Sequence, residues 1–166
     1  MKMKFSEVEA AFDFVSFGGM SGDHSAVLDR VAGKIYWRAD LSDFDEVPDE
    51  VLESEACIEV PHKRDLDLGN RLVFRFARSV MPDEEGRVRG LFNGRGAYAR
   101  YKDWLESKEL LQQWYDFEAA ETEKALREWC ADNEVELESF STTTQSSSAE
   151  TKIKHEGLKD TKLRAI

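Results

Sequence analysis

The stretch that decides the fold is residues 94–138, which read GRGAYARYKDWLESKELLQQWYDFEAAETEKALREWCADNEVELE. At about 100° per residue, its later apolar side chains fall in a sector roughly 120° wide, which predicts a helix with one buried face. That sector holds Leu111, Trp114, Tyr115, Ala125, Leu126 and Trp129. Glu118 and Thr122 lie in its middle. Because burying an unpaired carboxylate is costly, we expect Glu118 to be held by Arg75 or Arg95, or by a tyrosine hydroxyl.

Strands are expected on both sides of a short turn in the first half of the chain. Residues 26–29 and 34–37 flank a turn in which Gly33 can take a positive φ, which predicts a β-hairpin. Residues 57–60 predict a third strand, and residues 135–138 are expected to add an edge strand. Because a bare hairpin is marginal in water, helices must cover one face of this sheet.

Five helices are expected to supply that cover. Ser6 and Glu9 match a capping box for the first helix, and Asp67 is placed to cap the second. The fold class is therefore α+β, with a small antiparallel sheet of three or four strands packed against a layer of four or five helices. We expect the Glu118 helix to be central in that layer. The helices span residues 7–14, 67–80, 83–93 and 97–106, and the Glu118 helix ends near Asn133.

The chain is expected to form one α+β domain over residues 1–140. From residue 141 the sequence STTTQSSS predicts a disordered linker, because it offers little apolar surface to bury. Residues 151–166 are a mildly basic tail, which we interpret as an unstructured end or as a docking peptide.

No apolar run approaches the roughly 18 residues needed to cross a bilayer, and the first residues lack the apolar core of a signal peptide. These features predict a cytoplasmic protein with no membrane partner. Cys57 and Cys130 are far apart in sequence, which favours reduced, unreactive thiols over a redox or metal pair.

Charge is distributed unevenly along the chain. The net charge of −11 argues against nonspecific nucleic-acid binding by the whole protein. Residues 41–57 carry only acidic charges, whereas residues 61–102 carry ten Lys and Arg against five Asp and Glu. Either the two segments neutralise each other within the fold, or the basic segment forms a ligand-binding face. The arginines expected on that face are Arg71, Arg75, Arg78, Arg87, Arg89, Arg95 and Arg100.

Several motifs in a fixed order resemble a family of small bacterial proteins, uncharacterised protein family 0158. They are AFDFVSFGG, LDRVAGKIYW, IEVPHKRDLDLGNRLVFRF, GRGAYARYKDWL and WYDFEAAETEKALREWCADNEVEL, which together run from residue 10 to residue 137. The resemblance implies no particular activity, ligand or catalytic residue.

Candidate catalytic and metal-binding residues are few. Residues 61–67 offer His62 and two acids, but neighbouring bases compete for those acids and no paired His or Cys spacing accompanies them. We therefore predict no metal or other cofactor. Glu118 as a base with His62 as an acid is a candidate pair for a hydrolase, but a structural role for Glu118 is favoured.

The function predicted from the sequence is a non-catalytic protein-binding or regulatory module, or a homodimer, that uses the arginine-rich helical face. The first alternative is RNA or DNA binding by the same face, with Tyr98 or Tyr101 stacking on bases. The second alternative is the hydrolase-like enzyme centred on Glu118 and His62.

Overall fold

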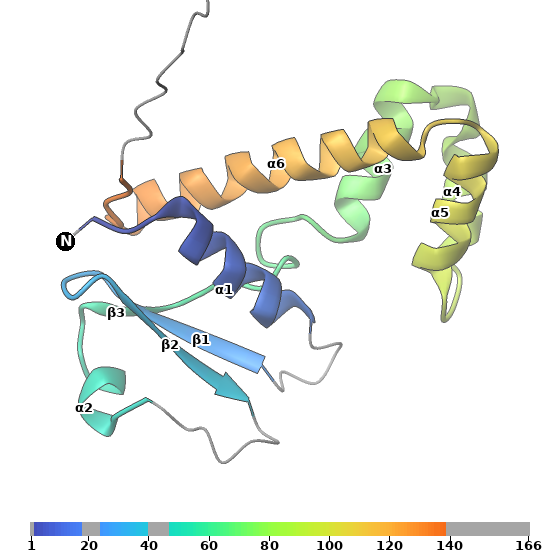
Figure 1. The fold of residues 1–166 in the computed structure, drawn as a ribbon. Coiled ribbons are helices and arrows are strands. Elements are labelled where there is room, and N and C mark those ends of the chain that lie inside the picture. Colours follow the sequence, from blue (N-terminus) through green and yellow to red (C-terminus); the bar gives the residue numbers. More distant parts are fainter. Residues whose placement is uncertain (1, 18–23, 40–46, 139–166) are drawn as a thin grey trace, which may run out of the picture.

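The structure is a computed structural model that describes residues 2–17, 24–39 and 47–138 (Figure 1). Its three-stranded antiparallel sheet and its helices confirm the predicted α+β class. In chain order the elements are α1(Phe5–Phe17), β1(His24–Asp29), β2(Lys34–Ala39), α2(Asp49–Leu52), β3(Cys57–Glu59), α3(Asn70–Val80), the 3₁₀ turn η1(Pro82–Glu84), α4(Glu85–Leu91), α5(Ala97–Ser107) and α6(Leu111–Asp132). The predicted linker and tail after residue 140 lie outside the described residues.

The hairpin forms where it was predicted. Strand β1 pairs with β2 from His24 opposite Ala39 to Asp29 opposite Lys34, and β3 pairs with the other edge of β1, giving the order β2-β1-β3. The turn is closed by the Gly33 N–H, which donates to the Asp29 carbonyl at 2.8 Å. Gly33 has φ 64°, a conformation in which a residue without a Cβ is favoured.

Helix α1 covers the sheet, and α6 packs across α1 on the side away from the strands (Figure 1). Val8 and Ala11 of α1 are fully buried, as is Leu28 of β1. The two helices run in opposite directions, because Met3 pairs with Leu137 while the Arg127 guanidinium lies 4.2 Å from the centre of the Phe5 ring. The expectation that the Glu118 helix itself is central to the sheet's cover therefore needs correction: α1 lies between them.

The other end of α6 belongs to a second group of helices, formed by α3, α4 and α5 (Figure 1). Helix α3 buries a stripe of apolar side chains on one side, with Leu72, Val73, Phe76 and Ala77 all inaccessible to solvent. Trp114 of α6 is also fully buried, and its indole packs edge-on against the rings of Phe76 and Tyr101, each at 5.3 Å between centres. Helix α6 thus contributes its N-terminal half to this cluster and its C-terminal half to the packing on α1.

Three predicted helix and strand ends differ from the structure. Helix α1 begins at Phe5, and the capping-box contact runs from the Lys4 N–H to the Glu7 carboxylate at 3.2 Å, two residues before the predicted pair. Helix α3 begins at Asn70 with Gly69 as its N-cap, so Asp67, which has φ 56°, lies two residues before the cap and does not cap the helix. Residues 135–138 make a single parallel bridge to Met3 and do not join the sheet.

The predicted buried sector of α6 is interrupted in its middle. Trp114 and Leu126 are fully buried as expected, whereas Tyr115 is 38% exposed and Trp129 is half-buried. The physical reason is that α6 packs against α3 and α5 near one end and against α1 near the other. Glu118 lies between these two contacts, where the surface is hollowed.

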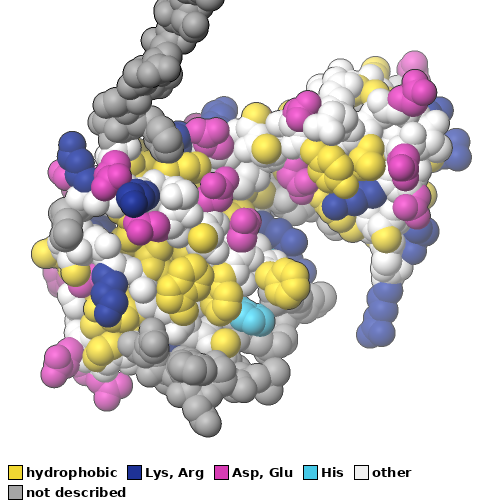
Figure 2. Space-filling view, viewed as in Figure 1, with side chains coloured by type: hydrophobic (Ala, Val, Ile, Leu, Met, Phe, Trp, Pro, Cys, Tyr) yellow, Lys and Arg dark blue, Asp and Glu magenta, His cyan; other side chains and the backbone are white. Residues whose placement is uncertain are grey.

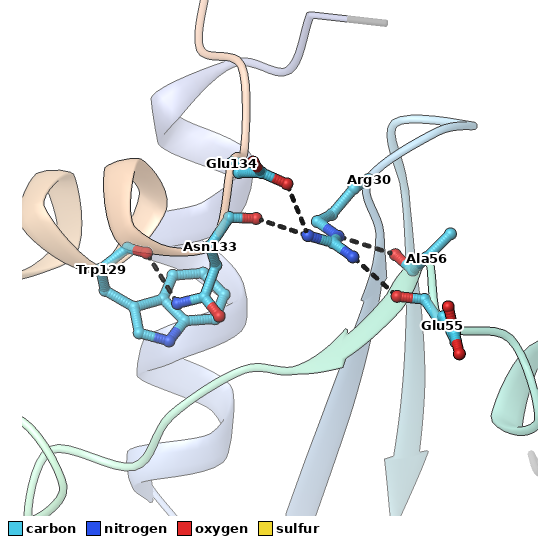
Figure 3. A network of polar contacts seen from close by, with 6 residues as sticks. All are labelled: Arg30, Glu55, Ala56, Trp129, Asn133 and Glu134. Atoms are coloured by element: carbon cyan, nitrogen blue, oxygen red, sulfur yellow. Dashed lines mark hydrogen bonds and ion pairs between the residues drawn. The ribbon is translucent and has the colours of Figure 1, made fainter.

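Arg30, in the hairpin turn, joins the sheet to the end of α6 (Figure 3). Its guanidinium donates to the carbonyls of Asn133 at 3.1 Å, Glu55 at 2.7 Å and Ala56 at 3.4 Å. Asn133 is the C-cap of α6, where unsatisfied carbonyls carry partial negative charge. One side chain therefore connects β1, the loop before β3 and the C-terminus of α6.

Candidate functional site

The candidate site is the hollowed surface around Glu118, visible below α6 between its two packing groups (Figure 2). It has two connected parts that share Glu118, Leu68 and Lys63. The first, which we call the α1–α6 groove, has a volume of about 580 Å³ and is walled by Phe12, Asp13, Phe17, Tyr115, Glu118 and Thr122. The second, which we call the α3–α5 hollow, has a volume of about 730 Å³ and is walled by Lys63, Arg64, Asp67, Arg71, Tyr98 and Glu118.

Glu118 is held by a tyrosine hydroxyl, one of the partners expected from the sequence. The Tyr98 hydroxyl donates to Glu118 Oε1 at 2.5 Å. Burial and this hydrogen bond to a carboxylate raise the pKa of Tyr98, and burial and the charge of Glu118 raise the pKa of Tyr101. Both phenols therefore stay protonated well beyond neutral pH, and Tyr98 acts as a permanent donor to Glu118.

His62 and Glu118 are not brought together. The His62 side chain is engaged in its own turn, where Nδ1 accepts the Arg64 N–H at 3.1 Å. Burial, followed by the charges of Arg64 and Lys63, lowers the pKa of His62. His62 lines neither part of the hollowed surface. The geometry therefore supplies no acid–base pair from these two residues.

Four of the seven predicted arginines form one exposed ridge on α3 and α4, which we call the arginine ridge: Arg71, Arg75, Arg78 and Arg89. The three on α3 follow the spacing i, i+4, i+7 and lie opposite its buried stripe. Each guanidinium has an acidic partner at 2.6–3.3 Å. These acids are Asp67 for Arg71, Glu121 for Arg75, and Glu85, which is shared by Arg78 and Arg89.

The other three predicted arginines lie elsewhere. Arg87 lies over the Trp104 ring at 5.8 Å. Arg100 donates to the carbonyls of Arg95 at 2.7 Å and Leu91 at 2.9 Å, so it stabilises the turn between α4 and α5. The structure therefore divides the predicted arginine-rich face into a ridge, a stacking contact and a turn.

The α3–α5 hollow combines cationic side chains with the start of α3. Gly69 is the N-cap of that helix and supplies no side-chain acceptor, so the first N–H groups are uncapped by side chains. Lys63 and Arg64 line the hollow, and neither has an ion-pair partner among the described residues. This part of the surface is electropositive, whereas the α1–α6 groove carries Glu9 and Asp13.

The thiols and acids offer no reactive centre in the described parts of the chain. Burial raises the pKa of Cys130 to about 11, and burial and the nearby Asp29 raise the pKa of Cys57. Both thiols are therefore protonated and weakly nucleophilic near neutral pH. Within residues 2–17, 24–39 and 47–138, no three His, Cys, Asp or Glu side chains are grouped to hold a metal ion.

Sequence reasoning found Glu118 and the ridge but missed the groove. Glu9 was considered only as part of a helix cap, and Asp13 and the exposed Phe17 were not singled out. Glu118 and Thr122 were the sequence signal for the groove. Polar residues inside an apolar sector indicate that no other element packs against that part of the helix face.

Comparison of the chain with models of known protein families, with curated proteins and with solved structures gives no match. Membership of uncharacterised protein family 0158 therefore stays a prediction from sequence motifs. None of the helices in the described residues has the length and apolar character needed to cross a membrane.

Proposed function

We propose that the protein is a non-catalytic binding or regulatory module that engages an acidic segment of a partner protein through the arginine ridge. The observation that carries this proposal is the exposure of its ion pairs: the guanidinium-bearing side chains of Arg71, Arg75, Arg78 and Arg89 are between 49% and 77% exposed.

Exposed pairs of this kind can be exchanged at little cost. A surface ion pair contributes about 0–1 kcal/mol, so replacing Asp67 or Glu85 by a partner's carboxylate sacrifices little stability. Arginine also binds a carboxylate through two parallel N–H groups, which favours a defined orientation of the partner. The arginine ridge is therefore suited to exchanging the carboxylates of its own chain for carboxylates of a partner protein.

The described contacts favour a protein partner over a nucleic acid. The internal partners of the ridge are the carboxylates of Asp67, Glu85 and Glu121, so its guanidinium groups are already placed for the acceptor group that an acidic protein segment supplies. The tyrosines considered for base stacking are poorly placed for it, since Tyr101 is fully buried and the Tyr98 ring has the Lys102 ammonium group 4.9 Å from its centre.

The test is a quantitative pull-down from cell lysate with the full chain as bait. The variant Arg71→Glu, Arg75→Glu, Arg78→Glu reverses three charges of the ridge. A matched control reverses three exposed lysines elsewhere: Lys2, Lys4 and Lys124.

We expect specific prey to be lost from the ridge variant, retained by the control, and eluted by moderate salt. Circular dichroism would show that both variants remain folded. Prey that binds the ridge variant as well as the wild type would refute the role of this face.

A further inference from the structure

The α1–α6 groove gathers exposed apolar side chains. Four large hydrophobic residues are exposed in the described chain, and two of them, Phe17 at 88% and Tyr115 at 38%, line this groove. Tyr98, a third, lies at 36% exposure in the adjoining hollow. Convergence of such side chains on one concave surface is typical of an interaction site.

The same groove is rimmed mainly by acids. Glu9 and Asp13 of α1 have no ion-pair partner among the described residues, and Glu118 closes the groove from α6. Lys63 is the basic residue in the lining, at the border with the α3–α5 hollow. A ligand that fits this surface must therefore carry both apolar and positively charged side chains.

The chain contains such a segment in residues 151–166. It carries two acids, Glu156 and Asp160, against five basic residues. The basic residues are Lys152, Lys154, Lys159, Lys162 and Arg164. Ile153, Leu158, Leu163 and Ile166 are interspersed with these charges. Its basic and apolar side chains therefore match the acids and the exposed apolar side chains of the groove.

The connection to this segment is long enough. Leu137 pairs with Met3, so the chain leaves the described structure beside the start of α1. The groove begins about 6 Å further along that helix, at Glu9, counted at 1.5 Å per residue from Phe5. Residues 139–150 can span up to about 40 Å. Such a tether holds a docking segment at millimolar effective concentration, so even a weak contact would fill the groove.

We propose that residues 151–166 dock within their own chain into the α1–α6 groove, with the aliphatic side chains against Phe17 and Tyr115 and the lysines beside Glu9, Asp13 and Glu118. This proposal does not rest on the arginine ridge, which lies on α3 and α4.

The test is zero-length cross-linking of the full chain with a carbodiimide, followed by mass spectrometry. This reagent joins a lysine Nζ to a carboxylate only when the two are in contact. We expect the main cross-links of the tail lysines to reach Glu9, Asp13 and Glu118. The acids Glu128 and Glu136, which are also exposed but lie outside the groove, should be joined rarely.

Matched variants separate docking from random collision. Phe17→Ser with Tyr115→Ser removes the apolar contacts but leaves every reactive acid and lysine in place. We expect it to lower the groove cross-links about fivefold. Val31→Ser, at a hydrophobic residue that is 73% exposed in the hairpin turn, should leave them unchanged.

The opposite outcomes overturn the proposal. Cross-links scattered over Glu128 and Glu136, or insensitive to the Phe17 and Tyr115 substitutions, would show that the tail does not dock in the groove. An equal mixture of light and heavy isotope-labelled chains tests the occupant. Cross-links between a light and a heavy copy would show that the tail of a second molecule occupies the groove, and would overturn docking within one chain.

Discussion

Arg30→Ala should be among the more destabilising substitutions of a polar residue in this chain. The guanidinium binds three carbonyls at 2.7, 3.1 and 3.4 Å, and its side chain is 26% exposed. A hydrogen bond from a charged donor contributes about 1.5–3 kcal/mol when buried. Partial exposure reduces this value because water can replace the arginine, and the 3.4 Å contact adds little. We therefore expect a loss of about 2–3 kcal/mol.

The ion pair of Arg30 with Glu134 should contribute almost nothing to that loss. The Glu134 side chain is 87% exposed, so its charge is screened by solvent. Arg30→Lys keeps the charge but lacks the planar fork that reaches carbonyls on separate segments. We expect it to recover less than half of the stability lost in Arg30→Ala.

Urea unfolding followed by circular dichroism and tryptophan fluorescence measures the effect, with the slope m expected to stay constant. Arg71→Ala is the control, because its side chain is 77% exposed and its partner Asp67, four residues earlier in the sequence, is 55% exposed. That variant should change stability by less than about 0.5 kcal/mol. A loss for Arg30→Ala as small as the loss for Arg71→Ala would refute the proposed role of the Arg30 network.

Three further outcomes are expected. Glu109→Gly should stabilise the fold by roughly 0.5–1 kcal/mol in urea unfolding, because Glu109 has φ 58° after the last turn of α5, where glycine is favoured. The raised pKa of Tyr98 and Tyr101 predicts that stability, measured as urea midpoints, is full below pH about 10 and falls above it. The unfolded chain releases these protons first, so alkaline pH favours unfolding. Cys130, fully protonated at neutral pH and 1% exposed, should react with thiol reagents only as fast as the chain unfolds, as followed by mass spectrometry.

Each of these outcomes has a matched control. Glu106→Gly, inside α5, should destabilise by about 1 kcal/mol, and equal signs for the two glycine variants would contradict the conformational argument. Tyr98→Phe should weaken the alkaline loss of stability, and an unaltered pH profile would show that this phenol does not contribute. Cys57 is half-buried and provides the more accessible reference thiol, so equal labelling rates for both cysteines would be inconsistent with the packing.

Local patterns predicted the elements whose stability is local. The stripe from Leu72 to Ala77 lies on one side of α3 because an amphipathic spacing needs no knowledge of the partner. The hairpin was predictable because Gly33 marks the turn that joins its strands. Both features were correct to within a few residues.

Features that depend on distant contacts were not predictable in the same way. The sequence indicated a buried face on α6 but not that α1 would lie between it and the sheet. It indicated that Glu118 needed a partner, while the choice of Tyr98 over Arg75 follows from the packing of α5 and from the pairing of Arg75 with Glu121. Arg30 gave no signal, since its acceptors are backbone carbonyls up to 103 residues away.

The shared helix has a consequence for how the molecule opens. Trp114 and Leu126 both lie on the continuous helix α6, yet they are buried by different neighbours: the α3–α5 group near Trp114 and α1 near Leu126. Separating α6 from either set of neighbours would expose a fully buried side chain to water. The two ends of the molecule are thus one cooperative unit, and amide hydrogen exchange along the middle of α6 reports global rather than local opening.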